Sequence, residues 1–70
     1  MAIKDHCGKY QELDVMQALD KTRLNETNRK AIIEYLCYGY RLKDLDISKQ
    51  QAFSRIKKII LALTNEERNR

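Results

Sequence analysis

Proline and tryptophan are absent from this chain of 70 residues, and glycine occurs only at Gly8 and Gly39. Proline and glycine build tight turns and interrupt helices, so their scarcity argues against short strands joined by hairpins. Leucine, isoleucine, lysine, arginine and glutamate are common instead. The length and this composition predict one all-α domain. The pattern along the chain, described below, predicts four to five helices in it, with a long C-terminal recognition helix.

Groups that catalyse reactions or bind metals are also scarce. Histidine occurs once, at His6, and the two cysteines, Cys7 and Cys37, do not form a CxxC pair. A zinc site needs three or four ligands, and no Ser/His/Asp, Cys/His or paired-carboxylate arrangement stands out. We therefore expect no enzyme activity, metal, cofactor or small-molecule ligand. A disulfide between the two cysteines stays open, although nothing indicates an oxidising compartment.

No apolar run approaches the length of a membrane span, and residues 1–20 are too charged for a signal peptide. These features predict a cytoplasmic protein that does not enter a membrane. A domain of this size hides only about 60% of its unfolded surface. Association of two copies is a common way to bury more.

Acidic residues are missing between positions 47 and 63, where four basic residues occur: Lys49, Arg55, Lys57 and Lys58. Residues 1–46 carry eight basic and eight acidic side chains, so the net charge of +4 lies entirely in residues 47–70. A localised positive surplus is typical of nucleic-acid binding. It also suits an anionic membrane surface, but the apolar residues here are β-branched and suited to a packed core.

The basic segment has the pattern of an amphipathic helix that begins after Ser48. Ser48 is a good N-cap, and Gln51 three residues later completes a capping box. The apolar residues recur every three or four positions, at Ala52, Ile56, Ile59, Ile60 and Leu63. At about 100° per residue, the opposite face holds Gln50, Gln51, Ser54, Lys57 and Lys58. This face predicts a DNA recognition helix, with a basic solvated helix as the alternative.

Before that helix we expect a flexible arm (1–8) and a folded domain (9–64), and after it a polar tail (65–70). The first helix runs from Lys9 or Gln11 to Lys21, and its apolar edge is either Leu13, Met16 and Leu19 or Val15 and Leu19.

The second expected helix runs from Glu26 to Tyr38, with Asn25 as N-cap and Gly39 at the left-handed position after its end. A short third helix spans Arg41–Leu45, with its leucines turned inward.

Residues 42–59 resemble a helix-turn-helix unit. In such units a leucine, a turn residue, an aliphatic residue, a Ser or Thr cap and then a small residue occur in order, as do Leu45, Asp46, Ile47, Ser48 and Ala52. Asp46 replaces the usual glycine, and the first helix of the unit is about one turn short. The preceding run 35–40 resembles that of PapB-type fimbrial operon regulators. With the small size, the chain is similar to plasmid-borne TrfB/KorA-like repressors.

This resemblance implies a transcriptional repressor that binds operator DNA as a homodimer. Base contacts are expected from Lys49, Gln50, Gln51 and Ser54. Phosphate contacts are expected from Ser48, Arg55, Lys57, Lys58, Tyr38, Tyr40 and Arg41. The dimer interface is expected at Ile59, Ile60, Leu61 and Leu63. The alternative is a small helical protein-interaction module, antitoxin-like or an anti-activator, with a basic surface.

Overall fold

The computed structural model describes residues 3–68, with side chains as far as Thr64. It contains three α-helices, α1 (Glu12–Asp20), α2 (Glu26–Leu36) and α3 (Lys49–Arg68), and two 3-10 turns, η1 (Ile3–His6) and η2 (Leu42–Asp44). No strand occurs in this part of the chain. The all-α prediction is confirmed, but the described part has fewer α-helices than the four to five helices predicted. Residues 1–2 and 69–70, and the side chains of the predicted tail, lie outside the described residues.

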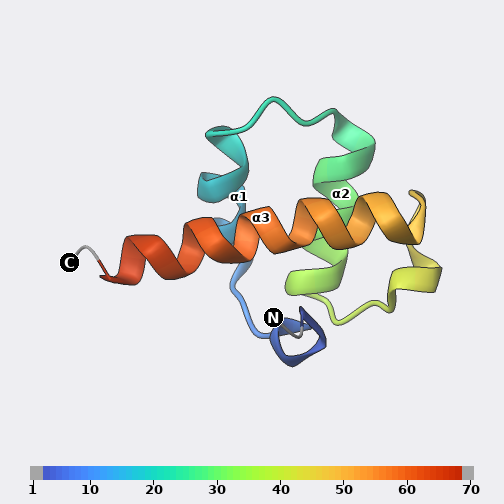
Figure 1. Ribbon diagram of the computed structural model, residues 1–70, viewed down its shortest axis with the longest axis horizontal. Coiled ribbons are helices and arrows are strands. Elements are labelled where there is room, and N and C mark those ends of the chain that lie inside the picture. The colour runs from blue at the N-terminus through green and yellow to red at the C-terminus, as the bar shows by residue number, and fades with distance from the viewer. Residues whose placement is uncertain (1–2, 69–70) are drawn as a thin grey trace.

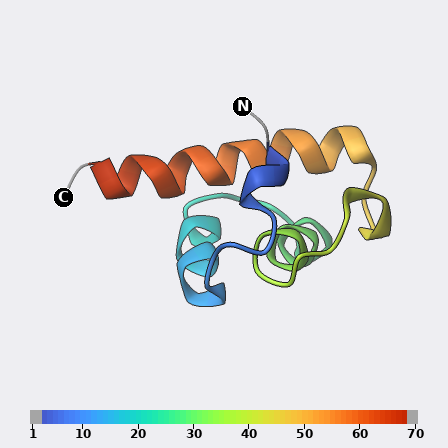
Figure 2. The same ribbon diagram turned by 90° about the horizontal axis from the view of Figure 1, so that it is seen from below.

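The longest helix, α3, organises the molecule. It lies across α1 and α2, which both pack against the same side of it (Figures 1 and 2). The domain measures 34 × 25 × 18 Å, and the 20 residues of α3 span about 30 Å at 1.5 Å per residue. Within the described part, no helix is long and apolar enough to cross a bilayer.

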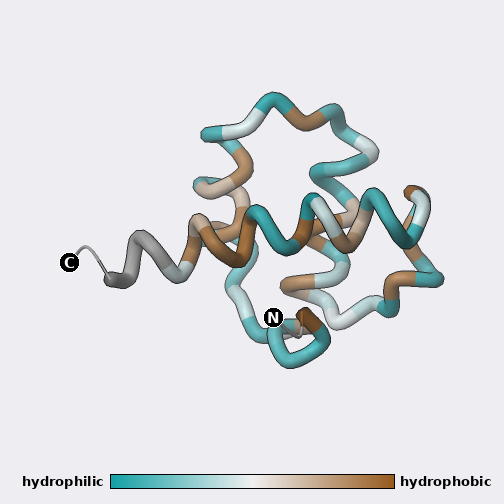
Figure 3. The backbone as a smooth tube through the Cα atoms, viewed as in Figure 1, coloured by the Kyte–Doolittle hydropathy of each residue, from teal (hydrophilic) through white to brown (hydrophobic). Residues whose placement is uncertain are grey.

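The core is built around the apolar stripe of α3, as the sequence predicts. All five residues of the stripe are buried, at 7% exposure or less: Ala52, Ile56, Ile59, Ile60 and Leu63. Brown and teal segments alternate along α3 in Figure 3, as expected for an amphipathic helix. In α1, Val15 and Leu19 face the core, whereas Leu13 is 65% and Met16 40% exposed. The structure thus selects one of the two predicted edges.

Both predicted N-caps are confirmed. The side-chain oxygen of Asn25 accepts a hydrogen bond from the Asn28 N–H at 2.9 Å, and the Ser48 hydroxyl accepts one from the Gln51 N–H at 3.2 Å. The end of α2 is two residues earlier than predicted, at Leu36. Gly39 has a φ of +78°, the left-handed conformation predicted for it.

The N-terminal segment differs from the expected flexible arm, because residues 3–8 pack on the domain. Ile3 in η1 is only 4% exposed and belongs to the core. The Gly8 N–H donates to the Tyr35 carbonyl at 2.9 Å, and the Tyr10 N–H donates to the Leu36 carbonyl at 3.0 Å. Since the last carbonyls of a helix have no partner within it, these bonds cap α2. The core therefore includes Ile3, which precedes the expected start of the domain at Lys9.

The connection between α2 and α3 also differs from the expectation. The predicted helix at 41–45 is wrong: only η2 forms there, and Arg41 and Leu45 on either side of it are extended. Leu45 is nevertheless buried and Leu42 packs against the core, so the leucines point inward as predicted. No non-glycine residue in the described part has a positive φ, so Asp46 does not make the left-handed turn. A compact helix-turn-helix is therefore not confirmed.

Candidate functional site

The side of α3 that faces away from α1 and α2 forms one exposed polar surface. We name this surface the α3 face; its exposed polar residues are Gln50, Gln51, Ser54, Lys57 and Lys58. Lys49 is exposed as well, but it is the first residue of the helix and lies above the buried stripe, because it precedes Ile56 by two turns. The α3 face is exposed because the apolar stripe on the other side of the helix is buried in the core, so the positions between the stripe residues point to solvent. The structure therefore places three of the four predicted base-contacting residues and two predicted phosphate-contacting lysines on one surface.

The positive charges of α3 are not neutralised within the described part of the chain. An ion pair joins Arg29 of α2 to Asp20 of α1 at 2.9 Å, but within the described side chains no such pair involves the four cations between positions 49 and 58: Lys49, Arg55, Lys57 and Lys58. Ser48 already uses its oxygen as N-cap acceptor. Exposed cations without counter-charges attract polyanions.

The N-terminal end of α3 contains a shallow hollow of about 420 Å³. Five residues predicted to contact DNA line it: Ser48, Gln50, Gln51, Ser54 and Arg55. Amide and hydroxyl groups can both donate and accept hydrogen bonds. The lining of this hollow therefore offers both donors and acceptors to a polar ligand.

Apart from Ser48, the predicted phosphate contacts outside α3, which are Tyr38, Tyr40 and Arg41, are not brought to this surface. Tyr38 lines a separate hollow formed by residues of α1 and α2, and none of the residues lining it belongs to α3. A hydrogen bond between its hydroxyl and the Glu12 carboxylate raises the pKa of Tyr38. The Tyr40 ring lies beside the Tyr38 ring, and the two ring centroids are 6.3 Å apart. A neighbouring carboxylate repels phosphate, so the structure argues against the role predicted for this pair. Arg41 is exposed but does not line the hollow at the start of α3.

The predicted dimer interface is largely unavailable. Ile59, Ile60 and Leu63 are 1%, 0% and 7% exposed, because they pack inside their own domain. Leu61 is 42% exposed, as its position on the helix predicts. Its neighbours one turn earlier are Lys57 and Lys58, so Leu61 lies on the α3 face itself.

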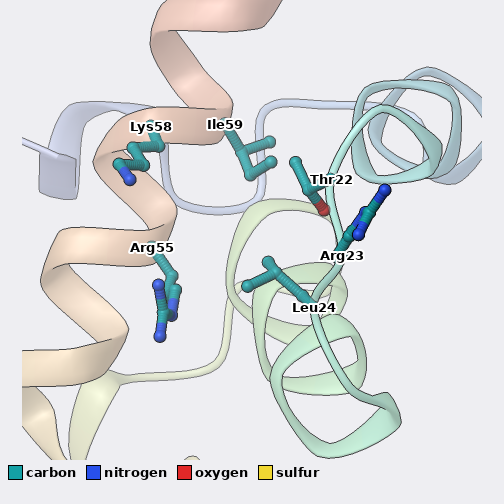
Figure 4. A pocket seen from close by; sticks show the side chains of 6 residues that line it. All are labelled: Thr22, Arg23, Leu24, Arg55, Lys58 and Ile59. Carbon is teal, nitrogen blue, oxygen red and sulfur yellow. The ribbon is translucent and has the colours of Figure 1, made fainter.

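Two residues that the sequence reasoning did not assign lie at or beside this face. Phe53 is 43% exposed; counting about 100° per residue would have placed it outside the buried stripe. Arg23, in the connection between α1 and α2, lines a second hollow of about 320 Å³ together with Thr22, Leu24, Arg55, Lys58 and Ile59 (Figure 4). No sequence signal joins Arg23 to α3, because they meet only through the fold.

The N-terminal His6 and Cys7 are held by neighbouring groups. The Nδ1 atom of His6 lies 2.9 Å from the Tyr10 hydroxyl, and the Cys7 thiol donates to the Tyr40 carbonyl at 3.6 Å. The structure describes both cysteines as free thiols. Burial, reinforced by the charges of Glu12 and Asp14, raises the pKa of the Cys37 thiol. A raised pKa lowers the thiolate fraction and hence nucleophilicity.

Comparisons of the chain with protein-family models, with curated proteins and with solved structures found no match.

Proposed function

We propose that this protein binds double-stranded DNA through the α3 face and represses transcription by occupying an operator. The observation that carries the proposal is the absence of acidic residues from 47 to 63 on a helix whose outward side is exposed. The major groove is about 12 Å wide and admits one α-helix. A helix of about 30 Å presented on one side of a small domain fits that groove.

The two ends of the α3 face have different proposed roles. Gln50, Gln51 and Ser54 near the helix start read base edges, because amides pair with adenine and hydroxyls with several bases. Lys49 reaches guanine or a phosphate. Arg55, Lys57 and Lys58 hold phosphates, which supply most of the affinity and its salt dependence.

In this proposal, α2, the connection 37–48 and α3 act as a divergent helix-turn-helix, with α3 in the recognition position. Leu45 and Ile47 still anchor the start of α3 to the core, as the corresponding leucine and aliphatic residue would in the unit that the sequence resembles. The 3-10 turn η2 lies in the connection, where the resemblance placed the first helix of the unit, and α2 takes the role of that helix in this proposal.

We also propose that the DNA-bound form is a homodimer. Contact through Leu61 would bring Lys57 and Lys58 of both copies together and cover the face that binds DNA. The exposed apolar pair on α1, Leu13 and Met16, avoids both problems and becomes the proposed contact. A two-fold axis then presents two α3 helices to half-sites about 34 Å apart.

A protein-interaction module is the second candidate, and the exposed Phe53 and Leu61 on α3 favour it. An acidic partner with an apolar patch would match these side chains and the surrounding lysines. Mobility shifts with duplex DNA separate the two functions. DNA binding predicts a shift that weakens with salt and is stronger for the promoter upstream of the coding region than for random duplex. No shift at low salt would overturn the DNA proposal and leave the interaction module.

A further inference from the structure

The hollow between the α1–α2 connection and α3 is lined by three cations and no acidic residue. Arg55 and Lys58 come from α3, and Arg23 comes from the facing connection, with Ile59 and Leu24 forming apolar walls between them (Figure 4). Its volume of about 320 Å³ accommodates a phosphate group. The Thr22 hydroxyl donates to the Leu19 carbonyl at 2.7 Å, so the charged side chains are the groups left to bind a ligand.

Arg55 is the centre of this arrangement. Its Nε atom is buried and has no hydrogen-bond partner in the described part of the chain. A buried donor without an acceptor is unfavourable. If the Arg55 side chain turns toward the hollow, an oxyanion that accepts from this N–H would remove a defect of the free protein. Arg55 also lines the hollow at the start of α3, and it therefore joins the two hollows.

The other two cations stand at the rim. Arg23 and Lys58 are exposed, and in Figure 4 the Arg23 side chain runs along the outer side of its connection. Neither forms an ion pair within the described residues. Long exposed side chains of this kind can turn about their own bonds toward a bound anion.

We propose that this hollow binds a phosphate group, with Arg55 as the primary donor and Arg23 and Lys58 as flanking charges. Arginine suits this role because its planar guanidinium matches the oxygens of phosphate. The proposal rests on the proposed function in one respect: the phosphate comes from a DNA strand that runs beside α3. Free phosphate has the same chemistry and is the other source.

The test compares Arg23→Gln with Lys30→Gln. Each removes one exposed positive charge, but Lys30 lies on α2 and lines the separate hollow beside Tyr38. The affinity of wild type and both variants for duplex DNA is measured between low and moderate salt, with folding checked by circular dichroism. We expect the slope of log affinity against log salt to fall by about one unit for Arg23→Gln and to stay unchanged for Lys30→Gln.

A second arm titrates inorganic phosphate alone into the wild type and Arg23→Gln, following the Nε–H resonance of Arg55 by NMR. A saturable shift of this resonance that weakens in Arg23→Gln supports the site. If the salt slope of DNA binding is also the same for Arg23→Gln and wild type, the natural source of the phosphate is free phosphate and not DNA. If wild type binds DNA, Arg23→Gln matches Lys30→Gln and phosphate leaves the resonance unmoved, the inference fails and DNA binding stands. If phosphate moves the resonance but no DNA binds, the proposed function fails and the site stands.

Discussion

Gly8 and Gly39 meet backbone to backbone where the N-terminal segment joins the end of α2. A Cβ atom built on Gly8 would lie 3.2 Å from the Cα atom of Gly39 and 3.4 Å from its nitrogen. Both glycines have positive φ angles, +67° and +78°. The sequence predicts a glycine at position 39 from the end of the preceding helix. The close approach of the two backbones explains why position 8 is a glycine too.

Replacing either glycine with alanine should destabilise the fold, and Gly8→Ala should cost more. A left-handed alanine costs about 1 kcal/mol at either position. Gly8→Ala adds the contact with the Gly39 backbone, whereas a Cβ on Gly39 lies 4.0 Å from Gly8 Cα, an ordinary distance. Urea unfolding measures both variants. Equal losses would show that the backbones do not approach so closely.

Replacing Gln50 with Ala should reduce discrimination between operator and random duplex. The loss on the operator should be about 1–3 kcal/mol, the usual value of a good bidentate base contact, and affinity for random duplex should change little. Fluorescence anisotropy with the two duplexes measures this. Gln17→Ala on α1 is the control for an exposed glutamine away from α3. A parallel loss on both duplexes would mean that Gln50 does not read bases.

Replacing Lys57 with Ala should weaken binding to every duplex and lower the salt slope by about one unit, because one condensed counterion fewer is released. Lys43→Ala, which removes an exposed lysine of η2, is the matched change in charge and should leave the slope unchanged. An identical slope for wild type and Lys57→Ala would show that this side chain touches no phosphate.

Assembly should depend on α1 rather than on the end of α3. Leu13→Lys introduces a charge at the proposed contact and should give a monomer in sedimentation velocity, with weaker operator binding and an unchanged circular dichroism spectrum. Leu61→Lys should remain dimeric. A dimeric Leu13→Lys together with a monomeric Leu61→Lys would place the interface on α3 instead. A wild type that stays monomeric at high concentration would contradict binding to a symmetric operator.

The phenol of Tyr38 should ionise above its ordinary pKa, because its hydrogen bond and charge interaction with Glu12 favour the protonated form. Glu12→Gln should lower the pKa of Tyr38 toward the ordinary value. Absorbance at 295 nm across alkaline pH, with Tyr38→Phe subtracted, isolates this phenol. Since the folded pKa is raised, the stabilisation is complete below the ordinary pKa and is lost as pH rises through the raised value. Coincident titration curves for wild type and Glu12→Gln would contradict this relationship.

Local features of the fold were predictable because each depends on residues a few positions apart. The N-caps Asn25 and Ser48 need only the backbone groups of the following turn. The buried stripe from Ala52 to Leu63 follows from the helical repeat of α3. The exposed polar side of the same helix follows from that stripe, so the sequence by itself determined the α3 face.

The tertiary structure decided which apolar positions find partners, because burial depends on segments distant in the chain. It buried Val15 and left Leu13 exposed, and it enclosed Ile60 within its own domain rather than at an interface between copies. It also reduced the expected helix at 41–45 to one turn. Arg23 lies across the hollow from Arg55 only because the α1–α2 connection packs beside α3, a long-range placement that no local pattern encodes.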